Sequence, residues 1–201
     1  ERELVEKTFK IYNFQTDTLF FDTTNFFTYL DTTNLRCTIA QRGKNKQKRY
    51  DLRQIGLAMV VTRKDMIPLF HLTYQGNMAD AVVFRDVIET IKDRMKVLGL
   101  DREKHTVVFD RGNNSRDNMA IVERLSLHYV GALTPYHHKQ LVNEAVDNFK
   151  EHDVDGSKMQ VYRDKRVIWQ QERTIIVFIS EKLKAGQVRG MYQSLEKAEK
   201  Q

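Results

Sequence analysis

The stretch Thr106-Val107-Val108-Phe109-Asp110-Arg111-Gly112 decides how the rest of the chain is interpreted. Three apolar, β-prone residues lead directly into an aspartate, which is typical of a fully buried strand that ends in a charged residue. Open α/β sheets carry their reactive groups at such strand ends. A second stretch, Thr18-Leu19-Phe20-Phe21-Asp22-Thr23-Thr24, has the same form. We therefore expect two buried strands that present the carboxylates of Asp22 and Asp110.

Composition restricts the class of protein. The chain has 201 residues, 41% of them hydrophobic and 30% charged, which indicates one good-sized core or a core plus a small second domain. No apolar run approaches the roughly 20 residues of a membrane span, and no signal-peptide pattern opens the chain. The single cysteine, Cys37, fits a reducing environment, so we expect a cytoplasmic protein without a membrane partner. Because CxxC and HExxH motifs are absent, a structural or thermolysin-like zinc site is not expected.

The positive charge is concentrated in residues 41–53. The whole chain carries a net charge of +6, and this segment, with six basic residues and one acidic residue, carries +5 of it. A concentrated patch is typical of polyanion binding, and a solvated surface loop is the alternative. In the nucleic-acid interpretation the basic side chains make salt-dependent, sequence-independent phosphate contacts. The basic residues are Arg42, Lys44, Lys46, Lys48, Arg49 and Arg53.

The apolar pattern predicts a mixed α/β core. Turn-forming residues 22–25 are expected to end the first strand. Asn77 is the expected cap of the first core helix, and Ser115 the expected cap of the second. The order of strand, hairpin, helix, strand, helix and strand is that of a ribonuclease-H-like mixed sheet flanked by helices. The expected strands are 18–22, 35–40, 55–61, 67–74, 106–110 and 129–133, and the helix that Asn77 caps covers residues 79–98.

The pattern changes after Pro135. Residues 140–149 predict a short helix, and residues 181–201 predict a charged helix. Between them, residues 159–163, 167–171 and 174–179 predict a small antiparallel sheet with Trp169 in its core.

The two aspartates suggest a metal site. In a ribonuclease-H-like order the first and fourth core strands are neighbours, so Asp22 and Asp110 lie close together. Two adjacent carboxylates repel unless a cation lies between them, and hard oxygen ligands favour Mg²⁺ or Mn²⁺. Two such ions promote phosphodiester chemistry, for which a third carboxylate is normally required. For each aspartate alone, an ordinary turn or cap residue is the alternative.

Five further residues leave two interpretations each. Arg111 either clamps a phosphate or pairs with the preceding aspartate. Asn113 and Asn114 either contact a DNA backbone or shape a turn, and the turn is the preferred interpretation. His137 and His138 are adjacent on a polar segment, so exposed histidines are preferred to metal ligands.

Six motifs occur in a fixed order between residues 18 and 135. They are FFDTTN (20–25), RGKNK (42–46), RYDLRQIGL (49–57), IPL (67–69), YQGNMAD (74–80) and VVFDRGNNS (107–115), the last followed by Asn118. As an ordered set they resemble the DDE transposases of bacterial and archaeal insertion sequences, in the group with a β-strand insertion domain. The resemblance covers roughly residues 18–135.

The resemblance implies an enzyme that uses Mg²⁺ or Mn²⁺ to cut DNA and transfer strands. Asp22 and Asp110 become its first two catalytic acids and metal ligands. The resemblance also implies that double-stranded DNA, both the transposon ends and the target, is its partner. It is compatible with a homodimer in the DNA complex. Residues 1–16 become a linker or the end of an upstream helix, 17–136 the first part of the catalytic core, and 137–201 part of the β-rich insertion.

The third acid is where the sequence departs from that family. Its glutamate belongs to a Y-x2-R-x3-E-x6-K motif, of which Tyr192 and Glu199 match two positions while Leu195 replaces the arginine. Glu199 is the candidate within the chain, but a surface charge in the insertion is the preferred interpretation. We expect the chain to be a fragment, with the glutamate beyond Gln201 and a DNA-end-binding domain upstream. The alternatives are a non-catalytic nucleic-acid-binding fragment and a ribonuclease-H-like nuclease.

Overall fold

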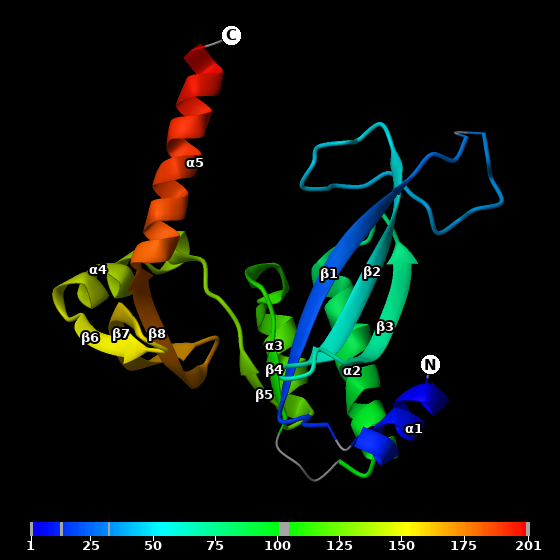
Figure 1. The fold of residues 1–201 in the computed structure, drawn as a ribbon, viewed down its shortest axis with the longest axis horizontal. Coiled ribbons are helices and arrows are strands. Elements are labelled where there is room, and N and C mark those ends of the chain that lie inside the picture. The colour runs from blue at the N-terminus through cyan, green and yellow to red at the C-terminus, as the bar shows by residue number, and fades with distance from the viewer. Residues whose placement is uncertain (1, 13, 32, 101–104, 200–201) are drawn as a thin grey trace. The chain divides into compact units, whose positions relative to one another are not determined.

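The computed structural model describes residues 2–12, 14–31, 33–100 and 105–199 (Figure 1). The chain divides into two compact units, the first ending at Leu133 and the second beginning at Thr134. None of the helices in the described part is long and apolar enough to cross a membrane.

The first unit is built on a five-stranded sheet in the order β3-β2-β1-β4-β5. β1 pairs antiparallel with β2, and β2 antiparallel with β3, whereas β4 lies parallel to β1 and β5 parallel to β4. This arrangement confirms the predicted ribonuclease-H-like mixed sheet. The strands are β1 (Thr18–Thr28), β2 (Arg53–Thr62), β3 (Pro68–Gln75), β4 (Thr106–Val108) and β5 (His128–Val130).

Helix α2 (Asp80–Val97) covers one face of this sheet. Its apolar residues recur every three to four positions, so they form one buried stripe. Phe84 at the centre of that stripe is 0% exposed, and its ring meets the rings of Phe21 and Phe109 edge-on, with centroids 5.2 and 4.8 Å apart. The other helical elements of the unit are α1 (Arg2–Tyr12), the 3-10 turn η1 (Arg111–Asn113) and α3 (Arg116–Arg124).

Strand β1 corrects one expectation. It continues through residues 22–25 to Thr28, where turn formers predicted its end. The reason is tertiary pairing: residues 19–28 of β1 form an unbroken antiparallel register with β2. A full ladder of strand partners outweighs the weak preference of Asp and Asn for turns.

Two other predicted features of the first unit differ from the structure, and a third is confirmed. Residues 35–40 form no strand, and their backbone meets the sheet at one hydrogen bond, from Gly76 N to Ile39 O over 3.2 Å. Helix α2 has Ala79 at its N-cap, without a side-chain hydrogen bond, so the prediction of Asn77 is wrong. Ser115 does cap α3, because its side chain accepts from the backbone nitrogen of Asn118.

The second unit contains a three-stranded antiparallel sheet in the order β6-β7-β8 and the terminal helix. The strand predicted at 159–163 continues through charged residues 164–166 to Ile168, and Lys165 lies opposite Thr174 in the ladder and forms an ion pair with Glu172. The strand predicted at 167–171 is wrong as a separate strand, because residues 169–170 form the turn before the next strand. Trp169 lies in the following turn at φ +50°, so its predicted strand position is wrong. The elements are η2 (Pro135–His138), α4 (Lys139–Asp147), β6 (Lys150–Val154), β7 (Ser157–Ile168), β8 (Gln171–Ser180) and α5 (Glu181–Glu199).

Candidate active site

The parallel register of β1 and β4 brings Asp22 and Asp110 to the same level. Phe20 pairs with Val108, and each aspartate lies two residues further along its strand. Asp110 follows the last paired residue in an extended conformation, with φ −75° and ψ 173°. Neighbouring strands are about 4.8 Å apart, so the two backbones are side by side at this level.

The phenylalanine beside each aspartate fixes the direction of its side chain. Phe21 and Phe109 are buried against Phe84 of α2. Successive residues of an extended chain point to opposite faces, so Asp22 and Asp110 belong to the face turned away from α2. Both aspartates are exposed, which leaves their carboxylates accessible to ligands.

One oxygen of each carboxylate has a hydrogen-bond donor. Oδ1 of Asp22 accepts from the backbone nitrogen of Thr23 over 2.8 Å. Oδ1 of Asp110 accepts from Nδ2 of Asn113 over 2.7 Å. Among the residues that the structure describes, Oδ2 of both aspartates has no such donor and is available to a ligand.

Two buried asparagines support Asp110. Asn113 and Asn118 are each 1% exposed, and Nδ2 of Asn118 donates to the backbone oxygen of Asn113 over 2.8 Å. Asn113 does lie in a turn, the 3-10 turn η1, but its side chain also contacts Asp110, which sequence analysis missed. The sequence signal for this contact was the position of an asparagine three residues after an aspartate. Asn114 donates to the backbone oxygen of Ala132 over 3.0 Å.

Arg111 is exposed and forms no ion pair with Asp110 in the described part of the chain. Of its two interpretations, the pairing with Asp110 is therefore not observed, and the phosphate clamp stays a prediction. His137 is exposed and His138 half-buried, both in η2.

The two carboxylates fit a hard divalent cation but do not complete a triad. No group of three or more His, Cys, Asp or Glu residues able to hold a metal occurs among the described residues. Mg²⁺ is commonly held by one or two carboxylates and keeps several waters, so the oxygens of Asp22 and Asp110 are suitable ligands. Glu199 is the last residue of α5 in the second unit, and its side chain is exposed.

The basic residues of the 41–53 segment fall into two groups. Arg49 donates two hydrogen bonds to Asp51, at 2.9 and 2.8 Å, and this contact lowers the pKa of Asp51 to about 2. Arg53 is half-buried and donates to the backbone oxygen of Asn34 over 2.8 Å. The remaining four have exposed side chains without an ion pair in the described structure. They are Arg42, Lys44, Lys46 and Lys48, here called the free cations.

Gln54 attaches the basic segment to the sheet. Its buried Nε2 donates to the backbone oxygens of Lys44 and Gly76 over 3.1 and 2.7 Å, and its backbone forms a bridge with Gln41. A Cβ on Gly43 would lie 2.2 Å from the backbone oxygen of Gly76, so only glycine allows this approach. The segment is therefore fixed at the end of the β2–β3 hairpin.

Tyr74 fixes the start of α2 on the same hairpin. It is 5% exposed, and its hydroxyl donates to Oδ1 of Asp80 over 3.1 Å. Burial and the neighbouring Asp80 raise the pKa of Tyr74 to about 12, so the phenol stays neutral at physiological pH. We therefore interpret Tyr74 as a structural residue.

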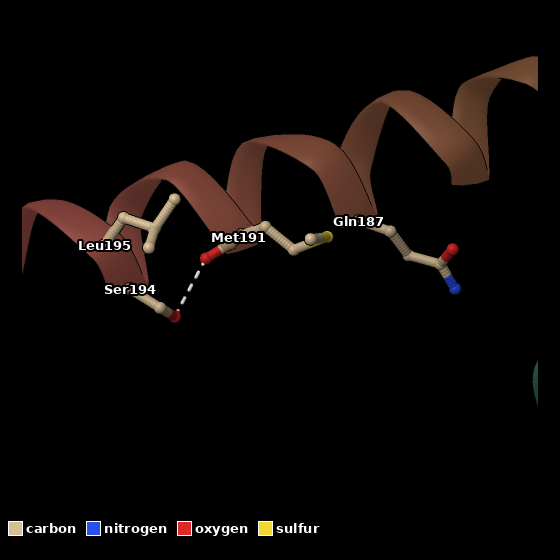
Figure 2. A pocket seen from close by; sticks show the side chains of 5 residues that line it. Gln187, Met191, Ser194 and Leu195 are labelled. Carbon is tan, nitrogen blue, oxygen red and sulfur yellow. Dashed lines mark hydrogen bonds between the residues drawn. The ribbon is translucent and has the colours of Figure 1, made fainter.

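A shallow hollow on α5 is lined by apolar and neutral polar residues among those that the structure describes. Figure 2 shows the side chains of Gln187, Met191 and Leu195 on the helix, and Gly190 also lines the hollow. Ser194 completes the lining, and its hydroxyl donates to the backbone oxygen of Gly190 over 2.9 Å. None of the described residues that line this hollow has a titratable side chain.

Comparisons with known proteins return solved structures only. No protein-family model and no curated protein matches the chain. The Mos1 transposase paired-end complex with left transposon end is 13% identical, with a TM-score of 0.40, over 72% of this chain and 46% of that chain. The piggyBac transposase synaptic complex with hairpin DNA is 11% identical, with a TM-score of 0.40, over 81% of this chain and 32% of that chain.

The isolated Mos1 transposase catalytic domain with Raltegravir and Mn gives a similar result. It is 10% identical, with a TM-score of 0.40, over 77% of this chain and 72% of that chain. The chain thus spans about half the length of the Mos1 chains in their DNA complexes. At these identities the likeness concerns the fold alone, and the ribonuclease-H-like assignment rests on the strand order described above.

Proposed function

We propose that the first unit is the metal-dependent catalytic core of a DDE-type transposase of a bacterial or archaeal insertion sequence, which cuts DNA phosphodiester bonds and transfers strands at transposon ends. The shared level of Asp22 and Asp110 on parallel strands is the observation that supports this proposal most directly. The second unit is, in this proposal, part of a β-rich insertion.

Each residue of the site has a role in the proposal. Asp22 and Asp110 hold Mg²⁺ or Mn²⁺ through the oxygens that lack a hydrogen-bond donor. When bound, such an ion supplies Lewis acidity and a more acidic water for attack on phosphorus. Arg111 holds a non-bridging phosphate oxygen next to the carboxylates. A third acid is required in addition.

The free cations give the proposal a DNA-binding surface. Gln54 is level with Phe27 of β1, five residues beyond Asp22. At a rise of about 3.3 Å per residue this is roughly 17 Å along the strand. In a DNA duplex the same length is about five base pairs. We therefore expect the basic segment to contact phosphates about five base pairs from the phosphate at the carboxylates.

Metal binding by the whole chain tests the proposal. Mn²⁺ is titrated into the wild type and into Asp22→Asn and Asp110→Asn, and free Mn²⁺ is followed by electron paramagnetic resonance. Asp117→Asn is the matched control, because Asp117 is an exposed acid in the first turn of α3. Both site variants are expected to lose the binding that the control keeps. Wild-type affinity in Asp110→Asn would contradict the proposed site.

A non-catalytic nucleic-acid-binding protein is the second candidate function. The observation that favours it is the attachment of the free cations through Gln54 and Gly76, which does not involve the carboxylates. Salt-dependent DNA binding together with no Mn²⁺ binding at Asp22 and Asp110 would support this candidate. A nuclease that never joins strands is distinguished by products, since it yields nicks without strand-transfer joints.

A further inference from the structure

Asn113 makes the side-chain contact that decides how Asp110 presents its carboxylate. Its Nδ2 donates to Oδ1 of Asp110 over 2.7 Å. Asn113 is 1% exposed, and its backbone oxygen accepts a hydrogen bond from the buried Asn118. A buried asparagine, held in place by a second one, thus reaches one of the two proposed metal ligands.

The chemistry of this contact fixes the orientation of the Asn113 amide. If the amide were turned over, its oxygen would face a carboxylate oxygen, and two acceptors would repel. In the observed orientation Oδ1 of Asn113 is buried without a hydrogen-bond partner in the described structure. Buried polar atoms without partners are uncommon. The hydrogen bond from Nδ2 of Asn113 to Asp110 therefore stabilises this orientation by more than the missing hydrogen bond at Oδ1 of Asn113 destabilises it.

The contact makes the two oxygens of Asp110 unequal as metal ligands. Oδ1 accepts from a fixed donor through one of its two lone pairs, whereas no donor reaches Oδ2 among the described residues, so an ion that binds both oxygens competes with that hydrogen bond for the electron density of Oδ1. Mg²⁺ demands octahedral geometry and takes single oxygens from carboxylates, whereas Ca²⁺ takes six to eight ligands and often both oxygens of one carboxylate. A carboxylate that binds mainly through one oxygen suits the smaller ion better.

We propose that Asn113 is a positioning residue that biases Asp110 toward ligation through Oδ2 and so favours Mg²⁺ or Mn²⁺ over Ca²⁺. The proposal rests on the proposed function, because it takes Asp22 and Asp110 as the metal ligands. Asn118 contributes by holding the backbone of Asn113, and Ser115 by capping the helix from which Asn118 reaches back.

Two substitutions remove the donor. Asn113→Leu keeps the branching and heavy-atom count of the side chain and deletes both the donor and the unpartnered acceptor. Asn113→Ala deletes them in a smaller side chain, so that one folded variant suffices if the other does not fold. Asn114→Ala is the matched control, because Asn114 is the next residue and donates to Ala132 rather than to Asp110. Circular dichroism and thermal melting establish that each variant is folded.

The experiment measures Mn²⁺ binding by electron paramagnetic resonance in the 201-residue chain, with Ca²⁺ as competitor. The readout is the ratio of the Ca²⁺ and Mn²⁺ dissociation constants, which a purely structural role of Asn113 would not change. Loss of an outer partner of a metal ligand commonly costs about tenfold or more in affinity, and we expect a preference change of about that size. The preference for Mn²⁺ is expected to fall in both Asn113 variants and to stay unchanged in Asn114→Ala.

The outcomes separate this inference from the proposed function. An unchanged ion preference in a folded Asn113 variant would overturn the role of Asn113, while the metal site stands if Asp110→Asn abolishes binding. Mn²⁺ binding that is indifferent to Asp22→Asn and Asp110→Asn would overturn the proposed site itself, and the role of Asn113 with it.

Discussion

Asp22 and Asp110 lie level with each other on neighbouring parallel strands, each two residues beyond a paired residue of β1 and β4. The strand register sets this relationship, and an aromatic cluster on the opposite face of the sheet supports it. Phe84 of α2 contacts the phenylalanines that adjoin both aspartates, at centroid distances of 5.2 and 4.8 Å. The position of the carboxylates is therefore coupled to the packing of α2 on the sheet.

Replacing Phe84 is expected to destabilise the first unit strongly. Phe84→Ala removes a side chain that is 0% exposed, and such truncations cost about 3–5 kcal/mol in the free energy of unfolding. Urea denaturation measures the change. Phe26→Ala is the control, because Phe26 is 56% exposed on β1 and is expected to cost less than about 1 kcal/mol. Equal losses in the two variants would contradict the central position of Phe84.

The strands of the core were largely predictable, because runs of apolar, β-prone residues indicate buried strands. Residues 107–109 are all apolar and β-prone up to Asp110, which is typical of a buried strand. β1 was only half predicted, since its second part, residues 23–28, owes its extended form to β2, which lies far away in sequence. β6 was missed because all five of its residues are exposed, so no apolar alternation marks it.

The two acids of the candidate site were predictable from the sequence, but the side chains that hold the site in place through hydrogen bonds were not. The positions of Asp22 and Asp110 follow from the strand order, which the sequence pattern indicates. The roles of Asn113 and Gln54 do not, because both act through hydrogen bonds to groups whose positions depend on the fold. Pairing of Arg49 with Asp51 likewise depends on the local loop conformation, although both residues were visible in the basic segment.

A side chain at Gly76 is expected to detach the basic segment. A Cβ there would lie 2.0 Å from the backbone oxygen of Gln54, and backbone atoms cannot move away cheaply. Gly76→Ala is therefore expected to lower the free energy of unfolding by about 1–3 kcal/mol, as overpacking substitutions do. Gly112→Ala is the control, since its nearest neighbour is 3.4 Å from the added Cβ. Chemical denaturation of both variants measures the difference, and a smaller loss at Gly76 than at Gly112 would rule out the close approach.

The two groups of basic residues are expected to contribute differently to DNA binding. Lys44→Ala removes a free cation and should reduce the slope of log affinity against log salt by about 1. Arg49→Ala should change that slope less, because Arg49 is already paired with Asp51. Asp51→Asn should tighten binding, because it releases Arg49 and removes a negative charge. Fluorescence anisotropy with a short duplex at several salt concentrations measures all three, and weaker binding by Asp51→Asn would contradict the grouping.

The ion pair between Arg49 and Asp51 lowers the pKa of Asp51 and thereby sets the pH range over which the pair persists. The contact lowers the pKa of Asp51 from 3.8 to about 2. A carboxyl whose pKa is lower in the folded state contributes stability above its unfolded pKa and loses it as pH falls through the folded value. The pair is thus complete above about pH 4 and is lost toward pH 2. The effect of Asp51→Asn on DNA affinity should therefore be the same at pH 5.5 and pH 8.

His105 is expected to be essential for the stability of the first unit. It is 0% exposed, and its ring nitrogens lie 2.8 Å from the backbone oxygens of Thr16 and Leu100. His105→Ala removes the ring that lies between these two carbonyls and opens a cavity, and a buried acceptor that loses its donor costs about 1–3 kcal/mol. His128→Ala, at an exposed position, is the control. Thermal unfolding followed by circular dichroism should separate the two variants clearly, and similar melting temperatures would contradict the role of His105.

The 201-residue chain is expected to cut DNA poorly even with Mg²⁺ or Mn²⁺ present. Two carboxylates hold an ion, but phosphodiester chemistry of this class uses ions that stabilise both the attacking and the leaving oxygen, which needs more ligands. No cluster of three acids is found in the described part of the chain. A nicking assay on supercoiled plasmid measures the activity, with Asp110→Asn as the reference for background. Robust nicking that disappears in Asp110→Asn would show that the chain supplies every ligand the reaction needs.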